Sequence, residues 1–204
     1  MSLFEGIHIV GLTGQSGAGK TTVSSILKDN GFSVIDADGI SRAVAKSEDF
    51  LCEVKRLFPE CVIEGELDRK RMASAVFKSG ELLRKYTAII FPYITKEFFN
   101  ALYRLKTDGE KIIIFDAPTL FESGLDSVCE AIIGVIAPME VKIKRILNRD
   151  GIPVDMVHSR LDTQKSEEFF KNNSDYLINN DGDLDSLINA VCSIAERIKE
   201  RFND

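Results

Sequence analysis

The stretch Gly14-Gln15-Ser16-Gly17-Ala18-Gly19-Lys20-Thr21 has the spacing GxxxxGK[ST], and a second hydroxyl residue, Thr22, follows it. Glycine at its two fixed positions lets the backbone turn so that consecutive N–H groups point at one anion. The lysine can then reach the β- and γ-phosphates of a nucleotide, and the threonine hydroxyl can bind Mg²⁺. Residues 14–21, the phosphate loop, therefore predict a site for nucleotide phosphates.

The residues on either side of the phosphate loop favour the same interpretation. Residues 7–12 form an apolar run of strand length, and residues 22–28 begin an amphipathic helix that ends at Asn30-Gly31. A helix that starts directly after the loop adds positive potential for an anion. The alternative, a glycine-rich turn with a solvated lysine, does not account for this strand–loop–helix order.

The composition limits the class of protein and of partner. The chain has 204 residues, 44% hydrophobic and 28% charged, which is typical of one globular domain with insertions. A net charge of −6 argues against nucleic acid or an anionic membrane as the main partner, since both require a concentrated basic field. The oligomeric state is left open.

The sequence shows no targeting or membrane signal and no disulfide framework. Residues 1–5 lack a basic segment followed by a long apolar one, and no apolar run approaches the ~18 residues of a membrane span, so we expect a cytoplasmic protein. The cysteines are widely spaced without a CxxC pattern, and we expect them to be reduced and mostly buried. They are Cys52, Cys61, Cys129 and Cys192.

Two carboxylates follow the second predicted strand, residues 32–35. Ligands of open α/β sheets bind at the carboxyl ends of the strands, so Asp36 and Asp38 should lie beside the phosphate loop. Alternatively, Asp38 only caps the next helix, predicted from Ile40 to Lys46. Arg42 shares a helix face with Asp38 and could pair with it or with a substrate anion.

From residue 47 to 106 the apolar spacing is helical, and no strand interrupts it convincingly. Helices are expected over residues 50–58, 67–77 and 82–105. Because a βαβ crossover needs far fewer residues, this stretch is expected to be an inserted, substrate-facing subdomain.

Two more apolar runs complete the nucleotide site. Residues 111–115 predict a strand that ends at Asp116, which is a Walker B-like pattern. Asp116 is then either a Mg²⁺ ligand together with Thr21 or only an aspartate of the following turn. Residues 131–136 predict a further strand, and the next helix carries Arg145 and Arg149 on one face. These arginines form either a solvated surface or a lid that closes over phosphate.

Residues 176–178 predict a fifth strand, and an amphipathic final helix follows. The alternation of strands and helices predicts a three-layer α/β fold of the P-loop NTPase type, with a five-stranded parallel sheet, a helical substrate-binding insertion and a lid. The expected single domain has a core at about residues 1–38, 107–144 and 174–204, an insertion at about 39–106 and a lid at about 145–173.

Taken together, these segments resemble the dephospho-coenzyme A kinase family over nearly the whole chain. The phosphate loop is common to many NTPases, whereas the order of the other motifs is specific. The matching segments are Leu12–Thr22, Val34–Asp38 with Arg42, Gly65–Arg69, Asp116–Glu122, Arg145–Gly151, Arg160 with Gln164, and Ile178–Gly182.

The resemblance implies ATP-dependent phosphorylation of the ribose 3′-hydroxyl of dephospho-coenzyme A, with Mg²⁺. It implies catalytic roles for Lys20, Asp38, Arg145 and Arg149. The implied ATP-binding residues are Gly14, Gly17, Ala18, Gly19, Lys20, Thr21, Thr22 and Asn180. The implied substrate-binding residues are Asp38, Arg42, Arg69, Pro118 and Leu120, and the implied metal ligands are Thr21 and Asp116.

Three positions depart from the family pattern. Phe91 precedes Pro92 where histidine is usual in the family, and Thr119 replaces a common leucine. The family usually has a basic residue directly after an acidic pair, here Glu167-Glu168, whereas the nearest basic residue in this chain is Lys171. None of these lies in the phosphate loop or at Asp38 or Asp116, so the departures bear on substrate affinity more than on activity.

Two other functions fit the phosphate loop. A nucleoside monophosphate kinase would share the loop and lid and differ only in the acceptor, which a panel of acceptors distinguishes. A regulatory nucleotide-binding switch would need an Asn-Lys-x-Asp guanine motif, and the sequence has none.

Overall fold

The chain divides into two compact units in a computed structural model that describes residues 5–76 and 79–202. One unit combines Met1–Ile35 with Arg104–Asp204, and the other spans Asp36–Tyr103. The first unit contains the main sheet, and the second is mostly helical.

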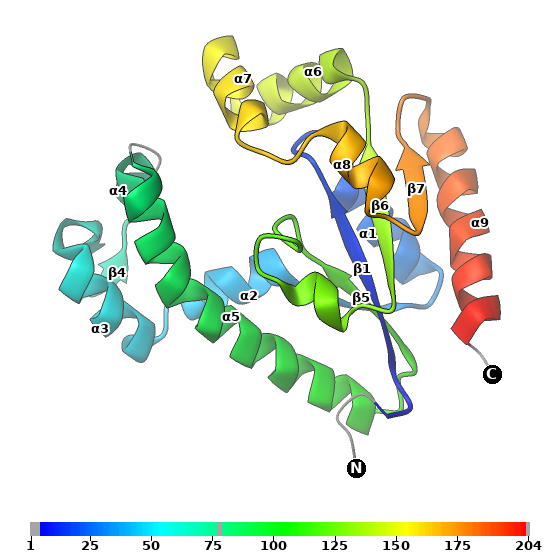
Figure 1. Ribbon diagram of the computed structural model, residues 1–204, viewed down its shortest axis with the longest axis horizontal. Helices are drawn as coiled ribbons and strands as arrows, with labels where there is room; N and C mark the ends of the chain where they lie inside the picture. Colours follow the sequence, from blue (N-terminus) through cyan, green and yellow to red (C-terminus); the bar gives the residue numbers. More distant parts are fainter. Residues whose placement is uncertain (1–4, 77–78, 203–204) are drawn as a thin grey trace. The chain divides into compact units, whose positions relative to one another are not determined.

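The main sheet has five strands in the order β2-β5-β1-β6-β7, as Figure 1 shows. The pairs β1–β5, β1–β6 and β6–β7 are parallel. All five strands were expected from apolar runs in the sequence, and the predicted α/β class is confirmed. The strands are β1 His8–Gly14, β2 Ser33–Asp36, β5 Ile112–Asp116, β6 Ala131–Ile136 and β7 Tyr176–Asn179.

The central strands are buried on both faces, as parallel strands covered by helices are. Every residue of β5 is buried, and so is every residue of β1 except its first. The register pairs Leu12 with Asp116, Gly14 with Val135, and Ile136 with Asn179. The carboxyl ends of β1, β5, β6 and β7 therefore meet at one edge of the sheet.

Two helices cover one face of the sheet. Helix α1, Lys20–Asp29, follows the phosphate loop, and α9, Leu184–Phe202, packs against both α1 and β7. Apolar residues of α9 at helical spacing join those of the strands in one core cluster, as their spacing in the sequence predicted. In α9 these are Leu187, Val191, Ile194, Ala195, Ile198 and Phe202.

A helical segment follows β6 and returns to the sheet at β7. It consists of α6 Met139–Asp150, α7 Val154–Asp162 and α8 Glu167–Asn172. Helices α6 and α7 bury Ile146 and Val157 in a small core of their own. A short 3₁₀ helix, Leu125–Val128, precedes β6.

The second unit is built from helices around an aromatic-rich core. Phe50 packs edge-on against Tyr86 and Tyr93, with ring centroids 6.4 and 5.6 Å apart. The longest helix, α5, continues into the first unit, yet neither it nor another helix within residues 5–76 and 79–202 is long and apolar enough to cross a bilayer. The helices are α2 Ala37–Val44, α3 Glu48–Leu57, the 3₁₀ turn Pro59–Cys61, α4 Arg69–Val76 and α5 Gly80–Thr107.

A two-stranded hairpin interrupts the helices of this unit, which corrects the expectation that no strand lies between residues 47 and 106. Strands β3 Val62–Ile63 and β4 Glu66–Leu67 are antiparallel. Glu64 and Gly65 have φ angles of 51° and 83°, as both residues of a tight hairpin turn require. Strands of two residues are too short to show an alternating pattern in sequence. Phe77, the predicted end of the next helix, lies outside the described residues.

The cysteines are free thiols, as expected, but their burial differs from the prediction. Cys61 is buried, and burial raises the pKa of its thiol. Cys129 and Cys192 are half-buried, and burial raises the pKa of Cys129 to about 12. Cys52 is exposed, so the expectation of mostly buried cysteines is wrong for this residue, which lies on the solvent side of α3.

Candidate active site

The phosphate loop connects the end of β1 to the start of α1, and its glycines occupy positions that other residues fit poorly. Gly19 is the residue before α1, with a φ of 99°, and a Cβ atom on it would collide with the Asn180 amide nitrogen. Gly17 has a φ of 78°, and its Cβ would lie 2.7 Å from the carbonyl oxygen of Lys142. Backbone angle and close packing together require glycine at both positions.

The N-terminus of α1 is open toward the loop. The helix begins at Lys20 without a side-chain cap. The N–H groups of Thr22 and Val23 donate to the Gly19 carbonyl at 3.0 and 3.2 Å, which leaves those of Lys20 and Thr21 for a ligand. Thr21 and Thr22 are exposed in this turn. The partial positive charge of the helix end favours an anion there. The predicted ATP-binding residues from Gly14 to Thr22 thus lie at the end of β1, in the loop and in the first turn of α1.

Lys20 forms an ion pair with Asp116, the last residue of β5. Both side chains are largely buried, with 13% and 8% of their surfaces exposed. The contact follows from the sheet register, which places Asp116 beside Leu12 of the neighbouring strand. The lysine predicted to bind phosphate and the carboxylate predicted to bind Mg²⁺ are therefore brought together.

Asn180 and Arg145 hold the carbonyl groups of the loop. The Asn180 Nδ2 group donates to the Ala18 carbonyl at 2.8 Å, and its Oδ1 accepts from Arg145 at 3.2 Å. The Arg145 guanidinium also donates to the carbonyls of Gly17 and Ala18, each at 3.3 Å. These contacts fix the Gly17 and Ala18 carbonyls and connect the loop to α6 and to the residue after β7.

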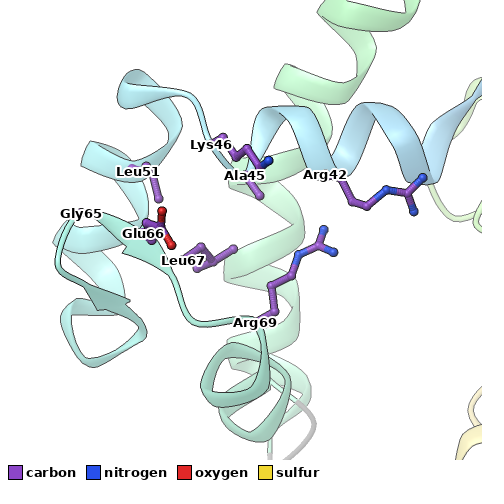
Figure 2. Close-up of a pocket in the computed structure, with 8 residues that line it drawn as sticks. All are labelled: Arg42, Ala45, Lys46, Leu51, Gly65, Glu66, Leu67 and Arg69. Atoms are coloured by element: carbon purple, nitrogen blue, oxygen red, sulfur yellow. The ribbon is translucent and has the colours of Figure 1, made fainter. Parts of the chain in front are cut away.

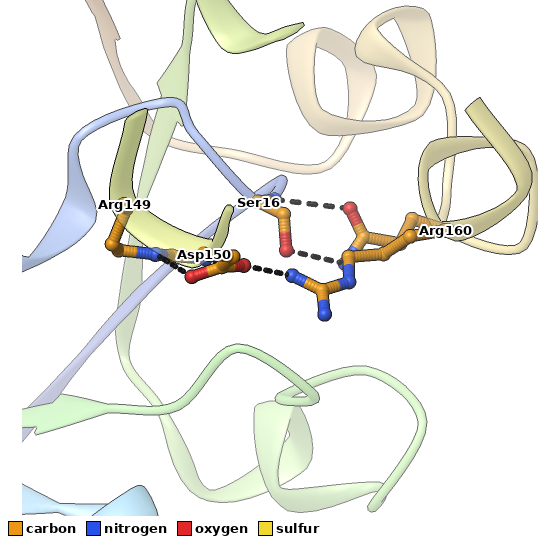
Figure 3. Close-up of polar contacts among 5 residues, drawn as sticks. Ser16, Arg149, Asp150 and Arg160 are labelled. Carbon is orange, nitrogen blue, oxygen red and sulfur yellow. Dashed lines mark hydrogen bonds and ion pairs between the residues drawn. The ribbon is translucent and has the colours of Figure 1, made fainter. Parts of the chain in front are cut away.

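The second predicted lid arginine has a different partner. Arg149 donates to both carboxylate oxygens of Asp150, at 2.7 and 3.1 Å, and Arg160 of α7 donates to one of them at 2.5 Å (Figure 3). The hydrogen bond from Arg149, followed by that from Arg160, lowers the pKa of Asp150 to about 2. Arg145 and Arg149 share a helix face but not a partner.

The loop has polar contacts that the sequence pattern did not reveal. The Ser16 N–H donates to the Gln164 Oε1 at 3.0 Å, and the Gln164 Nε2 donates to the Ser16 hydroxyl at 3.2 Å. The Gln15 amide contacts Lys142 of α6 and the carbonyl of Lys165. The motif leaves positions 15 and 16 unspecified, and Gln164 stood out only through the family resemblance.

The segment after β5 contacts the core through some of its residues. The carbonyl of Pro118 accepts from the Thr13 hydroxyl at 3.5 Å. Leu120 is fully buried and lies beside Gly11. This position makes Leu120 a packing residue, and its predicted contact with substrate stays a prediction.

The remaining predicted site residues belong to the second unit. Asp36, rather than Asp38, is the N-cap of α2, because its carboxylate accepts the Asp38 N–H at 2.9 Å. Arg42 donates to Asp36 at 3.1 Å and not to Asp38. Asp38 is exposed in the first turn of the helix. Its proximity to the phosphate loop stays a prediction.

A pocket of about 450 Å³ lies within the second unit. Figure 2 shows the Arg42 and Arg69 guanidinium groups on the same side of it, with Lys46 and Glu66 as its other charged residues. The cationic side chains outnumber the anionic one, so the pocket favours an anionic ligand. Its apolar part can contact an aliphatic chain. Its uncharged lining residues are Ala45, Leu51, Gly65 and Leu67.

The strand order and the loop between β1 and α1 define an α/β protein of the P-loop kinase class. The sequence matches the dephospho-CoA kinase family over residues 8–186 of its 204, and the chain belongs to that family.

Individual relatives agree with this assignment. A dephospho-CoA kinase of Fusobacterium nucleatum is 37% identical over 94% of this chain and 99% of its own length. The crystal structure of TT1252 from Thermus thermophilus is similar with a TM-score of 0.83 at 31% identity, covering 95% of this chain and 99% of that one. A dephospho-CoA kinase structure from Campylobacter jejuni, at 22% identity and a TM-score of 0.69, covers 94% and 97% and shows the same fold.

Proposed function

We propose that this protein carries out the reaction of its family by transferring the γ-phosphoryl group of ATP to the ribose 3′-hydroxyl of dephospho-CoA. The phosphate loop is the observation that carries the proposal. Its glycines have backbone angles unsuited to other residues, its helix end is open, and Lys20 lies at its C-terminal end. Phosphoryl transfer depends mainly on positioning and on neutralising charge, and these features supply both.

We assign ATP binding to the loop from Gly14 to Thr22. The N–H groups of Gly19, Lys20 and Thr21 bind phosphate oxygens, and the Lys20 ammonium group stabilises the charge that spreads over the transferred group. Asn180 acts on ATP through the loop, since its amide already binds the Ala18 carbonyl. Arg145 reaches the loop from α6 and is suited to contact the phosphates with its remaining donors.

Thr21 and Asp116 are the residues that would hold Mg²⁺. A hydroxyl and a carboxylate are oxygen ligands, which this ion prefers, and the contact of Asp116 with Lys20 places the carboxylate beside the loop. Within residues 5–76 and 79–202 no cluster of three or more His, Cys, Asp and Glu forms a metal cage. A site with few protein ligands is normal for Mg²⁺ bound with nucleotide phosphates. Bound there, Mg²⁺ would supply positive charge to offset that of the nucleotide phosphates.

We assign the acceptor side of the reaction to the second unit. Asp38 orients the 3′-hydroxyl of the acceptor, and it accepts the hydroxyl proton as the oxygen attacks the phosphorus atom. The Arg42 and Arg69 guanidinium groups bind the negatively charged groups of dephospho-CoA, and the apolar lining of their pocket contacts its pantetheine chain. Arg149 stabilises the transferring phosphate from the lid segment.

The assay that tests this proposal measures products by mass spectrometry with ATP, Mg²⁺ and one acceptor at a time. Dephospho-CoA should gain one phosphoryl group, while AMP, CMP and pantothenate should remain unmodified. Lys20→Ala should reduce the rate by about 10²-fold or more. Phosphorylation of AMP or CMP in preference to dephospho-CoA would assign the protein to nucleoside monophosphate kinases instead.

A further inference from the structure

Lys142 is a buried charge for which the proposed chemistry provides no role. It lies in α6, only 2% of its surface is exposed, and its Nζ group donates to the Gln15 Oε1 at 2.5 Å. Burial lowers the pKa of this ammonium group, and the Glu167 carboxylate raises it in part. A methionine would fill similar space without the cost of burying a charge. The lysine therefore requires an explanation other than packing.

The partner of Lys142 connects two parts of the chain. Gln15 is 6% exposed, and the oxygen and the nitrogen of its side-chain amide both form hydrogen bonds. Its oxygen accepts from Lys142, and its nitrogen donates to the Lys165 carbonyl at 2.9 Å. Because an amide bound at both ends cannot rotate, Lys142 determines which way the Gln15 amide faces.

The neighbouring loop residues touch the same two segments. Gly17 packs so closely on α6 that a Cβ atom would lie 2.9 Å from the Lys142 Cα. Ser16 exchanges hydrogen bonds with Gln164, the residue before Lys165. Residues 15–17 of the phosphate loop are thus held along one side by α6 and by the start of the segment that leads into α8.

We infer that Lys142 is a positioning residue for the phosphate loop: its ammonium group holds the Gln15 amide, and through it residues 15–17, in the shape that receives nucleotide phosphates. The inference rests on the proposed binding of ATP at this loop. Lys142 acts through Gln15 and does not itself contact phosphate, since its ammonium group is buried against the amide. Loss of the lysine should therefore affect ATP more than the acceptor.

The test compares Lys142→Met and Gln15→Leu with the double variant in the full-length protein. Lys144→Met is the matched control, because Lys144 is exposed on the same helix. Isothermal titration with ATP and Mg²⁺ gives Kd, and steady-state kinetics give kcat and KM for each substrate. We expect each single variant to raise the Kd and KM for ATP about 10-fold and to leave the KM for the acceptor within about 2-fold. The double variant should bind ATP no more weakly than either single variant, and Lys144→Met should bind ATP with the Kd of the wild type.

Thermal unfolding separates positioning from stability. Lys142→Met leaves the buried Gln15 oxygen without its donor, so it should lower the melting temperature. The double variant replaces both polar partners by apolar side chains, so it should recover the wild-type melting temperature while its ATP binding stays weak. Unchanged ATP affinity in Lys142→Met would overturn the inference, and so would additive effects in the double variant, which would mean that the lysine acts on the nucleotide directly. If Lys142→Met does not fold, Gln15→Leu alone decides, since wild-type ATP affinity in that variant contradicts the inference. Failure of the wild type itself to bind ATP would instead refute the proposed function.

Discussion

At the scale of single residues, two nearby carboxylates have different local roles. Asp36 uses its oxygens to cap α2 and to pair with Arg42. Asp38 contributes only its backbone N–H to the cap, and its side chain is exposed. The cap explanation that competed for Asp38 therefore belongs to Asp36, and this favours Asp38 as the proposed base.

Replacing Asp38 by asparagine should lower kcat by about 10²-fold or more, because an amide cannot accept the hydroxyl proton. ATP affinity measured by titration should stay within about 2-fold of the wild type, since the proposed base binds no part of ATP. Asp36→Asn is the matched control, because asparagine keeps the cap and should retain most of kcat. Wild-type kcat in Asp38→Asn would remove the base assignment.

The Asp150 carboxylate should make stability depend on pH in the acid range. Its folded-state pKa of about 2 lies below the ordinary 3.8, so its stabilising effect is complete above about pH 4 and is lost as the pH falls toward 2. The melting temperature of Asp150→Asn should lie below that of the wild type at pH 7, and the difference should shrink between pH 4 and pH 2. The effect should be small and weaken with salt, because the arginine partners are exposed. A difference that is the same at all these pH values would contradict the assignment.

At the scale of elements, the start of α2 was predicted three residues too late. The spacing of apolar residues suggested a start at Ile40, whereas the helix begins at Ala37 directly after the cap residue Asp36. Because β2 ends at this same aspartate, strand and helix follow each other without a loop. The carboxylate that ends the strand also begins the helix.

The cap at Asp36 should contribute measurably to stability. Asp36→Ala should lower the free energy of unfolding by about 1 kcal/mol in urea titrations, because the Asp38 N–H loses its acceptor. Asp36→Asn retains the cap and removes only an exposed ion pair with Arg42. Its free energy of unfolding should therefore fall by less than that of Asp36→Ala. Equal losses in the two variants would mean that the ion pair, and not the cap, stabilises this element.

At the scale of the whole molecule, the phosphate loop is held by segments far apart in the chain. β5 supplies Asp116, α6 supplies Lys142 and Arg145, and the residue after β7 is Asn180. All of them belong to the first compact unit. A ligand in the loop therefore contacts, directly or through one residue, most strands of the sheet, and its binding should stabilise this unit as a whole.

ATP with Mg²⁺ should raise the melting temperature of the wild type. At an ATP concentration of about 100 times Kd, binding should raise the free energy of unfolding by about 2.7 kcal/mol. Lys20→Ala should lose most of this shift at the same ATP concentration, because the phosphates lose their main positive side chain. Lys144→Ala, exposed on α6, is the control and should keep it. An equal ATP shift in Lys20→Ala would contradict the proposed role of the lysine.

The sequence by itself determined the class of fold, the phosphate loop and the family. Buried parallel strands appear in the sequence as continuous apolar runs. Positions with left-handed backbone angles or crowded surroundings require glycine, so both features can be recognised from the sequence alone. Gly14 and Gly19 were therefore identified before their surroundings were known, whereas Gly17 was implied only by the family resemblance. The hairpin at residues 62–67 was missed because its strands have only two residues each.

The tertiary structure decided which side chains hold the loop. The contact of Gln15 with Lys142 spans 127 residues, and that of Asn180 with Ala18 spans 162. No local pattern encodes such pairs, because a lysine in a helix is usually solvated and only packing shows that this one is buried. The partners of Arg145 lie 128 and 35 residues away, at Gly17 and Asn180, so they too emerged only from the fold. The cap at Asp36 is local, two residues from its donor, but the sequence also allowed Asp38 as the capping residue, and the structure decided between them.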